Sequence, residues 1–209
     1  MLTLYFGAHT CAFASLIALI EAGAPYKLHR LDFGKGEQRQ PDYLAINPKG
    51  RVPALATPHG ILTETPAILA FIAQSFPAAR LAPINDPFAF AQIQAFNSYL
   101  CSTVHVAHAH RVRGSRWADD PVAIEDMKRK VPETVGACFD LIERQMFKGP
   151  WVAGEAYTIA DPYLFTIGQW LEGDGVDIKS FPSVFDHSRR MMERPTVQRA
   201  LAEQSGKAA

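Results

Sequence analysis

The sequence is poor in cysteine and has no excess of either charge. Its three cysteines, Cys11, Cys101 and Cys138, are widely spaced, so neither a disulfide framework nor a zinc-binding pair is expected. The 21 basic and 21 acidic residues cancel, which excludes a general positive field that would attract nucleic acid or anionic lipid. We therefore expect no nucleic-acid or membrane partner, and a reducing, cytoplasmic location.

Long hydrophobic runs are also missing. The most apolar stretch, from Cys11 to Ile20, is far shorter than the roughly 20 residues that a membrane-spanning helix needs. The first basic residue, Lys27, follows this stretch instead of preceding it, so a secretory signal peptide is not expected. A hydrophobic content of 48% with 20% charged residues is typical of a folded globule.

The first 80 residues predict a small α+β domain with the element order β-α-β-α-β-β-α. The first two strands are joined through a helix and should be parallel, with a right-handed crossover. The last two are joined across Pro58-His59-Gly60 and should form an antiparallel hairpin. The predicted strands are 2–6, 26–31, 52–57 and 61–63, and the predicted helices are 11–22, 42–46 and 65–76.

A linker is predicted from Pro83 to Pro87, and everything after it reads as helical. Apolar residues recur at three- and four-residue spacing over 93–107 and again over 127–146, which predicts two long helices packed as an antiparallel pair. Three more helices are expected over 157–171, 182–193 and 195–203. The chain therefore divides into an α+β domain, 1–80, and an all-α helical-bundle domain, 87–209.

Cys11 lies where the first strand turns into a helix. The N-terminus of a helix favours negative charge, so a thiolate at Cys11 would be stabilised there and could form a mixed disulfide or contact a bound thiolate. The alternative is that Cys11 is an ordinary buried cysteine that only packs.

Two further motifs suggest a peptide-binding site. The general frequency of X–Pro bonds favours a trans bond at Val52-Pro53, whereas a cis bond would turn the Val52 backbone outward to pair with an extended peptide. Thr65 is expected to cap the following helix, with Pro66 at its first position. The free N–H groups at this N-terminus could bind a carboxylate, and Glu64 could bind an ammonium group. The alternative is that Thr65 only caps its own helix.

Histidines and a capping motif complete the candidates. His105 and His108 share a helix face, but no carboxylate or cysteine pattern completes a metal site, so no metal is expected. His105 could instead donate a hydrogen bond to a ligand, or be merely structural. Thr158 and Asp161 form a capping-box pattern, which is a device of folding and not of catalysis.

Taken together and in this order, these motifs resemble the glutathione transferase superfamily. The resemblance rests on Asn47-Pro48-Lys49-Gly50, Val52-Pro53, Glu64-Thr65, and the segment from Trp151 through Gly154 to Thr158-Ile159-Ala160-Asp161. It extends over nearly the whole chain and is nearest to the bacterial beta class. It implies a thioredoxin-like N-terminal domain packed on an all-helical domain, usually as a homodimer, here across the 64–76 helix and the first long helix.

The resemblance also implies how glutathione would bind. Val52, before a cis Pro53, would pair through its backbone with the cysteinyl part of the tripeptide. Glu64 and Thr65 would hold the γ-glutamyl end. Lys35 lies in the loop that reaches the glycine carboxylate in similar bacterial proteins.

The catalytic roles follow from the same resemblance. Cys11 corresponds to the cysteine beside the glutathione sulfur in beta-class proteins, and His105 to the histidine that the helical domain contributes. A basic residue expected after that histidine is replaced by Val106. Tyr5 resembles the catalytic tyrosine of other classes and ranks below Cys11. The second substrate is expected in an apolar cleft lined by His9, Thr10, Ser102 and Val106.

The expected activity is therefore that of a glutathione transferase. It would bind reduced glutathione as a co-substrate, stabilise its thiolate and add it to a small apolar electrophile, as in detoxification. Alternatives on the same scaffold are a glutathione-dependent isomerase, a dehalogenase, a thiol–disulfide oxidoreductase, or a non-catalytic ligand-binding or interaction protein.

Overall fold

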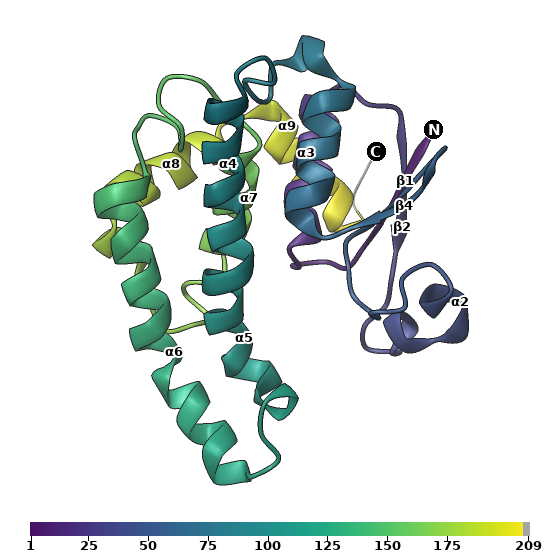
Figure 1. Cartoon of the computed structure of the whole chain (residues 1–209). Coiled ribbons are helices and arrows are strands. Elements are labelled where there is room, and N and C mark those ends of the chain that lie inside the picture. Colours follow the sequence, from purple (N-terminus) through teal and green to yellow (C-terminus); the bar gives the residue numbers. More distant parts are fainter. Residues whose placement is uncertain (207–209) are drawn as a thin grey trace.

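The structure, a computed structural model, describes residues 1–206. Figure 1 shows a sheet with a few helices beside a larger, wholly helical part. This is the predicted architecture, a thioredoxin-like N-terminal domain followed by a helical C-terminal domain. Within residues 1–206, no helix combines the length and apolarity that crossing a membrane requires.

Four strands form one sheet in the order β2-β1-β3-β4. The strands are β1 (Leu2–Phe6), β2 (Tyr26–Arg30), β3 (Ala54–Thr57) and β4 (Gly60–Thr63). β1 and β2 are parallel and β3 and β4 form an antiparallel hairpin, both as predicted. The third strand begins at Ala54 and not at Val52 as predicted, since Pro53 has no N–H group to donate to a neighbouring strand.

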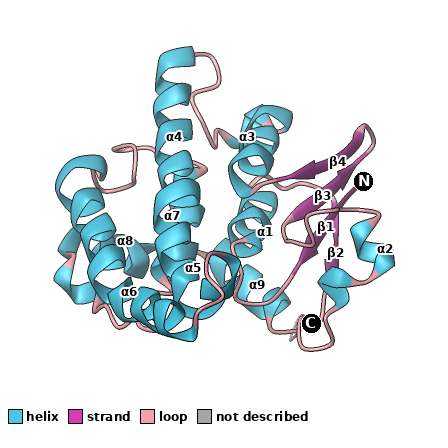
Figure 2. Ribbon diagram, turned by 60° about the horizontal axis from the view of Figure 1, so that its bottom comes forward, coloured by secondary structure: helices cyan, strands magenta, loops and turns pink. Residues whose placement is uncertain are grey.

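The helix α1 (Ala12–Glu21) lies at the centre of the molecule. Every residue from Ala12 to Ile20 is buried, because α1 packs on β1 and α3 (Thr65–Ser75) and also on helices of the C-terminal domain. The short helix α2 (Pro41–Leu44) covers the opposite face of the sheet, where Tyr43 is buried (Figure 2). The apolar run noted in the sequence is thus a core helix that both domains cover.

The C-terminal domain is built from α4 (Pro87–Tyr99), α5 (His105–Arg113), α6 (Pro121–Leu141), α7 (Ala160–Gly168), α8 (Pro182–Met192) and α9 (Pro195–Gln204). The two predicted long helices are present: α4 leads into α5, and α6 packs on α5 (Figure 1). Each of them carries a π-helical turn that the periodicity did not predict, over 100–104 and 142–146. The π-helical turn over 100–104 ends at His105, whose backbone N–H donates to the Leu100 carbonyl.

The capping motif of α7 is more extensive than the sequence suggests. The fully buried Asp161 accepts hydrogen bonds from the Thr158 N–H at 2.6 Å and the Thr158 hydroxyl at 3.2 Å. Thr158 Oγ1 accepts in turn from the Ala160 N–H at 3.3 Å. Asp161 also accepts from the Val152 N–H at 2.9 Å and lies 3.1 Å from His187 Nε2 in α8. One carboxylate therefore joins a loop and two helices.

We expect Asp161→Ala to lower the free energy of unfolding by about 3–5 kcal/mol, because it leaves two buried N–H donors without an acceptor. The matched control is Asp86→Ala at the exposed N-cap of α4, where the carboxylate accepts from Phe88 and Ala89. That change should cost only about 1 kcal/mol. Urea unfolding of both variants is the measurement, and equal losses would contradict the structural role given to Asp161.

Candidate active site

A cavity of about 600 Å³ opens between the two domains. The N-terminal domain lines it with residues from the start of α1, the segment before β3 and the start of α3. The C-terminal domain contributes α5 and the turn that follows it. Most of the predicted site residues meet here, namely His9, Thr10, Cys11, Val52, Pro53, Glu64, Thr65, His105 and Val106.

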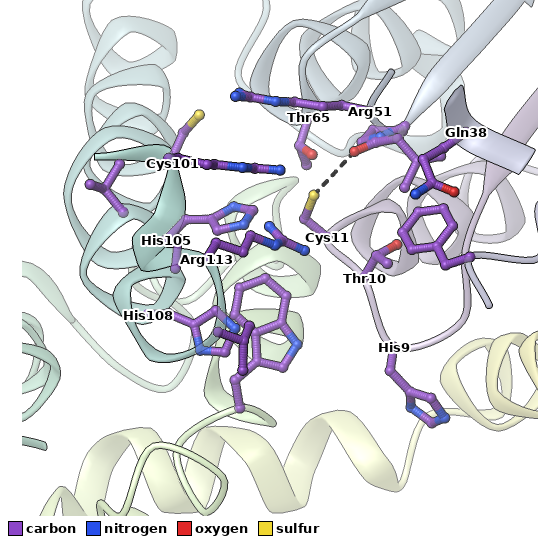
Figure 3. A pocket seen from close by; sticks show the side chains of 18 of the residues that line it. His9, Thr10, Cys11, Gln38, Arg51, Thr65, Cys101, His105, His108 and Arg113 are labelled. Carbon is purple, nitrogen blue, oxygen red and sulfur yellow. Dashed lines mark hydrogen bonds between the residues drawn. The ribbon is translucent and has the colours of Figure 1, made fainter. Parts of the chain in front are cut away.

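Cys11 lies at the base of this cavity, at the N-cap position of α1. Its Sγ is 3.6 Å from the Val52 carbonyl oxygen, to which it donates (Figure 3). Burial raises the pKa of the Cys11 thiol to about 11, and the hydrogen bond with Thr65 offsets this only in part. The expected stabilisation of a thiolate by the helix N-terminus is therefore outweighed, and Cys11 is a neutral thiol at physiological pH.

The Val52-Pro53 peptide is cis. The general frequency of X–Pro bonds was a poor guide here, and the geometry implied by the family resemblance is found. Val52 precedes β3 and is outside its pairing with β1, which involves only Ala54, Leu55 and Ala56. Val52 lines the cavity, and its carbonyl oxygen is the acceptor of the Cys11 thiol.

Glu64 and Thr65 stand at the start of α3. Glu64 occupies the N-cap position with a positive φ of 71° and forms an ion pair with Lys49. Thr65 is already the first residue of the helix and makes no capping hydrogen bond, so its predicted capping role is wrong. Pro66 consequently occupies the second position. The Thr65 hydroxyl is left to face the cavity and Cys11.

His105 enters the cavity from the first residue of α5. Its ring meets the edge of Trp170 with a centroid distance of 4.9 Å. Burial, followed by the positive charges of His108 and nearby arginines, lowers the pKa of His105 to about 4. His105 is therefore neutral at physiological pH and can donate one N–H.

His108 supports the wall behind His105 and does not join it in a metal site. Its Nδ1 is 2.8 Å from both carboxylate oxygens of the buried Asp174, and its ring stacks on Trp170 at 4.4 Å. Asp174 also pairs with Arg111 at 3.0 Å. Across residues 1–206, no group of three or more potential metal ligands is present.

Three predicted site residues do not line the cavity. Alternation along β1 directs Leu4 and Phe6 toward the core and Tyr5 to the other face, where it packs on Tyr43 at 5.8 Å. The Lys35 ammonium pairs with Asp32 at 3.6 Å in an exposed loop. Ser102 is exposed, and its hydroxyl donates to the Ser98 carbonyl at 2.8 Å.

Two residues of the loop after β1, His9 and Thr10, make hydrogen bonds within the protein. The Thr10 hydroxyl donates to the Gly7 carbonyl at 2.8 Å and so closes the turn into α1. The His9 N–H donates to Gln204 at 3.0 Å, and its side chain is turned away from Cys11 in Figure 3. Both residues nevertheless line the cavity, and their contribution to a second-substrate site stays a prediction.

Arginines are the cavity residues that the sequence analysis missed. Arg51 and Arg113 reach in from opposite sides (Figure 3). A signal was available in the basic cluster Arg111, Arg113 and Arg116 at the end of α5, which the bundle interpretation left unused. The cavity is accordingly far more basic than the apolar cleft that we predicted for the second substrate.

Comparison with known proteins now places the chain in a family. Residues 1–74 match the family model "Glutathione S-transferase, N-terminal domain", and residues 115–195 match the corresponding C-terminal domain. A glutathione S-transferase GstA of Escherichia coli O157:H7 is 32% identical over 202 residues, covering 95% of this chain and 96% of that protein. The chain belongs to the glutathione S-transferase family.

Solved structures agree with this assignment. A glutathione transferase homologue from Sulfitobacter, determined with bound glutathione, is 49% identical, covers 99% of both chains and superposes with a TM-score of 0.93. A bacterial beta-class glutathione S-transferase of Sphingomonas chungbukensis is 29% identical, with a TM-score of 0.84 and coverage of 97% and 98%. The bacterial beta-class resemblance seen in the sequence is thus confirmed.

The raised pKa of Cys11 predicts slow alkylation. At pH 7.5 a thiol of pKa 11 holds roughly 300-fold less thiolate than a free cysteine of pKa about 8.5. Iodoacetamide should therefore modify Cys11 much more slowly than free cysteine, with a rate that still rises with pH beyond about pH 10, where the rate for free cysteine has levelled off. Mass spectrometry of the Cys11 peptide measures this, and rapid labelling at neutral pH would mean that Cys11 is an ionised nucleophile.

Proposed function

We propose that this protein is a glutathione transferase that binds reduced glutathione in the interdomain cavity and adds its sulfur to a small apolar electrophile. One observation carries the proposal. Cys11, the Val52-Pro53 backbone and Glu64-Thr65 converge on one cavity with His105 of the other domain. Such a convergence offers separate partners for each part of the tripeptide and for its thiolate.

The γ-glutamyl end of glutathione would bind at the start of α3. The free N–H groups of this helix end and the Thr65 hydroxyl are suited to its carboxylate. Glu64 is suited to its ammonium group, and this would replace the ion pair that Glu64 now makes with Lys49. The cysteinyl part would then pass Val52, whose backbone can pair with it as an added strand would.

The sulfur of glutathione would lie above Cys11. A free thiol with a pKa of about 8.5 is mostly protonated at neutral pH, so donors that favour the thiolate increase the reactive fraction. The Cys11 S–H and the neutral His105 N–H are two such donors. Glutathione releases its proton to solvent, its sulfur bonds to the electrophilic carbon, and the leaving group departs with the bonding electrons.

The alternative activities all need the same bound thiolate, but they differ in what they ask of Cys11. Thiol–disulfide exchange needs Cys11 itself as a thiolate, which its burial and raised pKa oppose. Transfer needs only a donor at this position. The neutral thiol therefore favours transfer over exchange.

We also propose a homodimer formed across α3 and α4, in the cytoplasm, with a role in detoxification. Phe88 on α4 is 74% exposed and Ile61 on β4, the strand that precedes α3, is 43% exposed, and a second copy could cover such apolar side chains. The three cysteines are free, as a reducing location requires. We also propose that the chain divides into domains at 1–80 and 87–209. Residues 207–209 of the second domain lie outside the part of the chain that the structure describes.

We expect Glu64→Gln to weaken glutathione binding about tenfold or more, because it removes the charge that would face the ammonium group. The variant keeps the shape of the side chain at a position with positive φ, so the fold should be retained. Glu133→Gln is the matched control, since Glu133 is exposed on α6 and pairs only with Lys130. Titration calorimetry with reduced glutathione is the measurement. Unchanged affinity in Glu64→Gln would remove Glu64 from the site.

We expect Cys11→Ala to raise the pKa of the bound glutathione thiol by about one unit, because a hydrogen bond to the sulfur is lost. With glutathione saturating, the value of kcat/KM for the electrophile should fall about tenfold at pH values below that pKa and recover above it. Cys11→Ser should retain most of the effect, and Cys138→Ala serves as the control for loss of a buried thiol elsewhere. A pH profile that does not shift, or complete loss of activity in both Cys11 variants, would argue against a donor role.

A further inference from the structure

The cavity concentrates positive charge although the chain as a whole has none. Glu64 is the single carboxylate among the described residues that line it, and Lys49 pairs with that carboxylate. Five arginines line the same cavity, namely Arg39, Arg51, Arg111, Arg113 and Arg116. A cavity of this kind favours an anionic ligand.

Most of these arginines lack a protein counter-ion. Arg111 is neutralised, since it pairs with Asp174 at 3.0 Å and donates to the Gly173 carbonyl at 2.7 Å. Within residues 1–206, no carboxylate lies within 4.0 Å of the other four guanidinium groups, those of Arg39, Arg51, Arg113 and Arg116. The cations are therefore available for a ligand.

The remaining arginines act on one another electrostatically. Burial and then the charges of Arg113, Arg51 and Arg39 lower the pKa of Arg116. The charges of Arg113, Arg116 and Arg51 also contribute to the low pKa of His105. These four arginines are thus close enough to repel each other across the cavity, and a bound anion would relieve that repulsion.

Glutathione accounts for only part of this charge. It has two carboxylates, one of which is assigned above to the start of α3. The other can be met by Arg39 or Arg51, which belong to the N-terminal domain. Arg113 and Arg116 come from the other domain, and the Arg113 guanidinium is directed toward Cys11 (Figure 3). Both arginines line the part of the cavity that the C-terminal domain contributes, and we expect the second substrate to approach the glutathione sulfur from there.

The C-terminal domain also lines the cavity with apolar side chains, those of Val106, Val112, Trp117 and Trp170. Val112 is 67% exposed and Trp117 is 48% exposed. An aromatic body can pack on these side chains while an acidic group on it meets the guanidinium groups.

We propose that the second substrate is an apolar, preferably aromatic, electrophile that carries a carboxylate, which Arg113 and Arg116 bind. This inference rests on the proposed transferase function, because that function supplies the thiolate. In the step itself the glutathione sulfur bonds to the electrophilic ring carbon, and a halide leaves with the bonding electrons. The carboxylate takes no part in the bond changes and serves only to bind and orient the ring.

The first test is binding, with dinitrobenzoate and its uncharged analogue dinitrobenzamide as probes. Both quench the fluorescence of nearby tryptophans, and the protein is first saturated with S-methylglutathione so that the glutathione carboxylates are in place. We expect the acid to bind about tenfold more tightly than the amide, with a preference that declines as salt is added. Equal binding of acid and amide would overturn the proposal.

The second test is turnover with chlorodinitrobenzoate, its chlorine para to the carboxylate, and with the methyl ester of the same compound. We expect the ratio of kcat/KM for acid over ester, each value first divided by the uncatalysed rate constant of that compound with glutathione, to exceed about ten and to fall at least tenfold in the double variant Arg113→Gln, Arg116→Gln. Arg129→Gln on α6, where Arg129 pairs with Asp126 outside the cavity, should keep the ratio. A ratio unchanged in the double variant would overturn the assignment of these arginines.

Failure of the proposed function gives a different result. If the protein does not bind reduced glutathione in calorimetry and conjugates neither acceptor, the transferase function is wrong. In that case, the binding of dinitrobenzoate and dinitrobenzamide is compared without S-methylglutathione. A preference for the acid would then show only that the arginines bind a carboxylate. If glutathione binds and the ester is conjugated as well as the acid after division by the uncatalysed rate constants, the transferase function stands and the acidic second substrate is wrong.

Discussion

The burial of α1 between the two domains is the constraint on which the rest of the structure depends. Residues 12–20 of this helix are all shielded from solvent, so its N-terminus can only open into a cavity that both domains border. Cys11 is placed at that opening with an 8% exposed side chain. The same burial that positions the thiol also keeps it protonated, because a low-dielectric surrounding disfavours the charged form more than the helix end favours it.

The elements that could be predicted are those whose signal is local. Alternation along β1, the parallel crossover to β2 and the hairpin at Gly60 follow from periodicity and turn chemistry. The Thr158–Asp161 box follows from its spacing. The further hydrogen bonds of Asp161 to Val152 and His187 could not be predicted, because they join segments whose relative position is set only by the packing of the whole domain.

Site residues could be predicted where a short motif fixes the local backbone conformation. They were harder to predict where the direction of a long side chain decides whether it reaches the cavity. Glu64, Thr65 and the Val52-Pro53 bond line the cavity as the family pattern implies. Lys35 does not line the cavity. It pairs with the nearby Asp32, and no sequence motif indicates this pairing. The π-helical turn over 100–104 adds a similar uncertainty, because it changes the phase of the helix just before His105 and leaves Ser102 exposed.

Charge shows the clearest gap between composition and structure. Equal numbers of acidic and basic residues exclude a global field, but they say nothing about how charges are distributed in space. Here acids of α6 pair with basic residues three positions away on its surface, whereas the arginines after His105 have no such neighbours and line the interdomain cavity. Local pairing thus neutralises the surface and leaves the cavity basic. A neutral protein can in this way hold a strongly cationic binding site, and the chemistry of its ligand must be inferred from the cavity and not from the net charge.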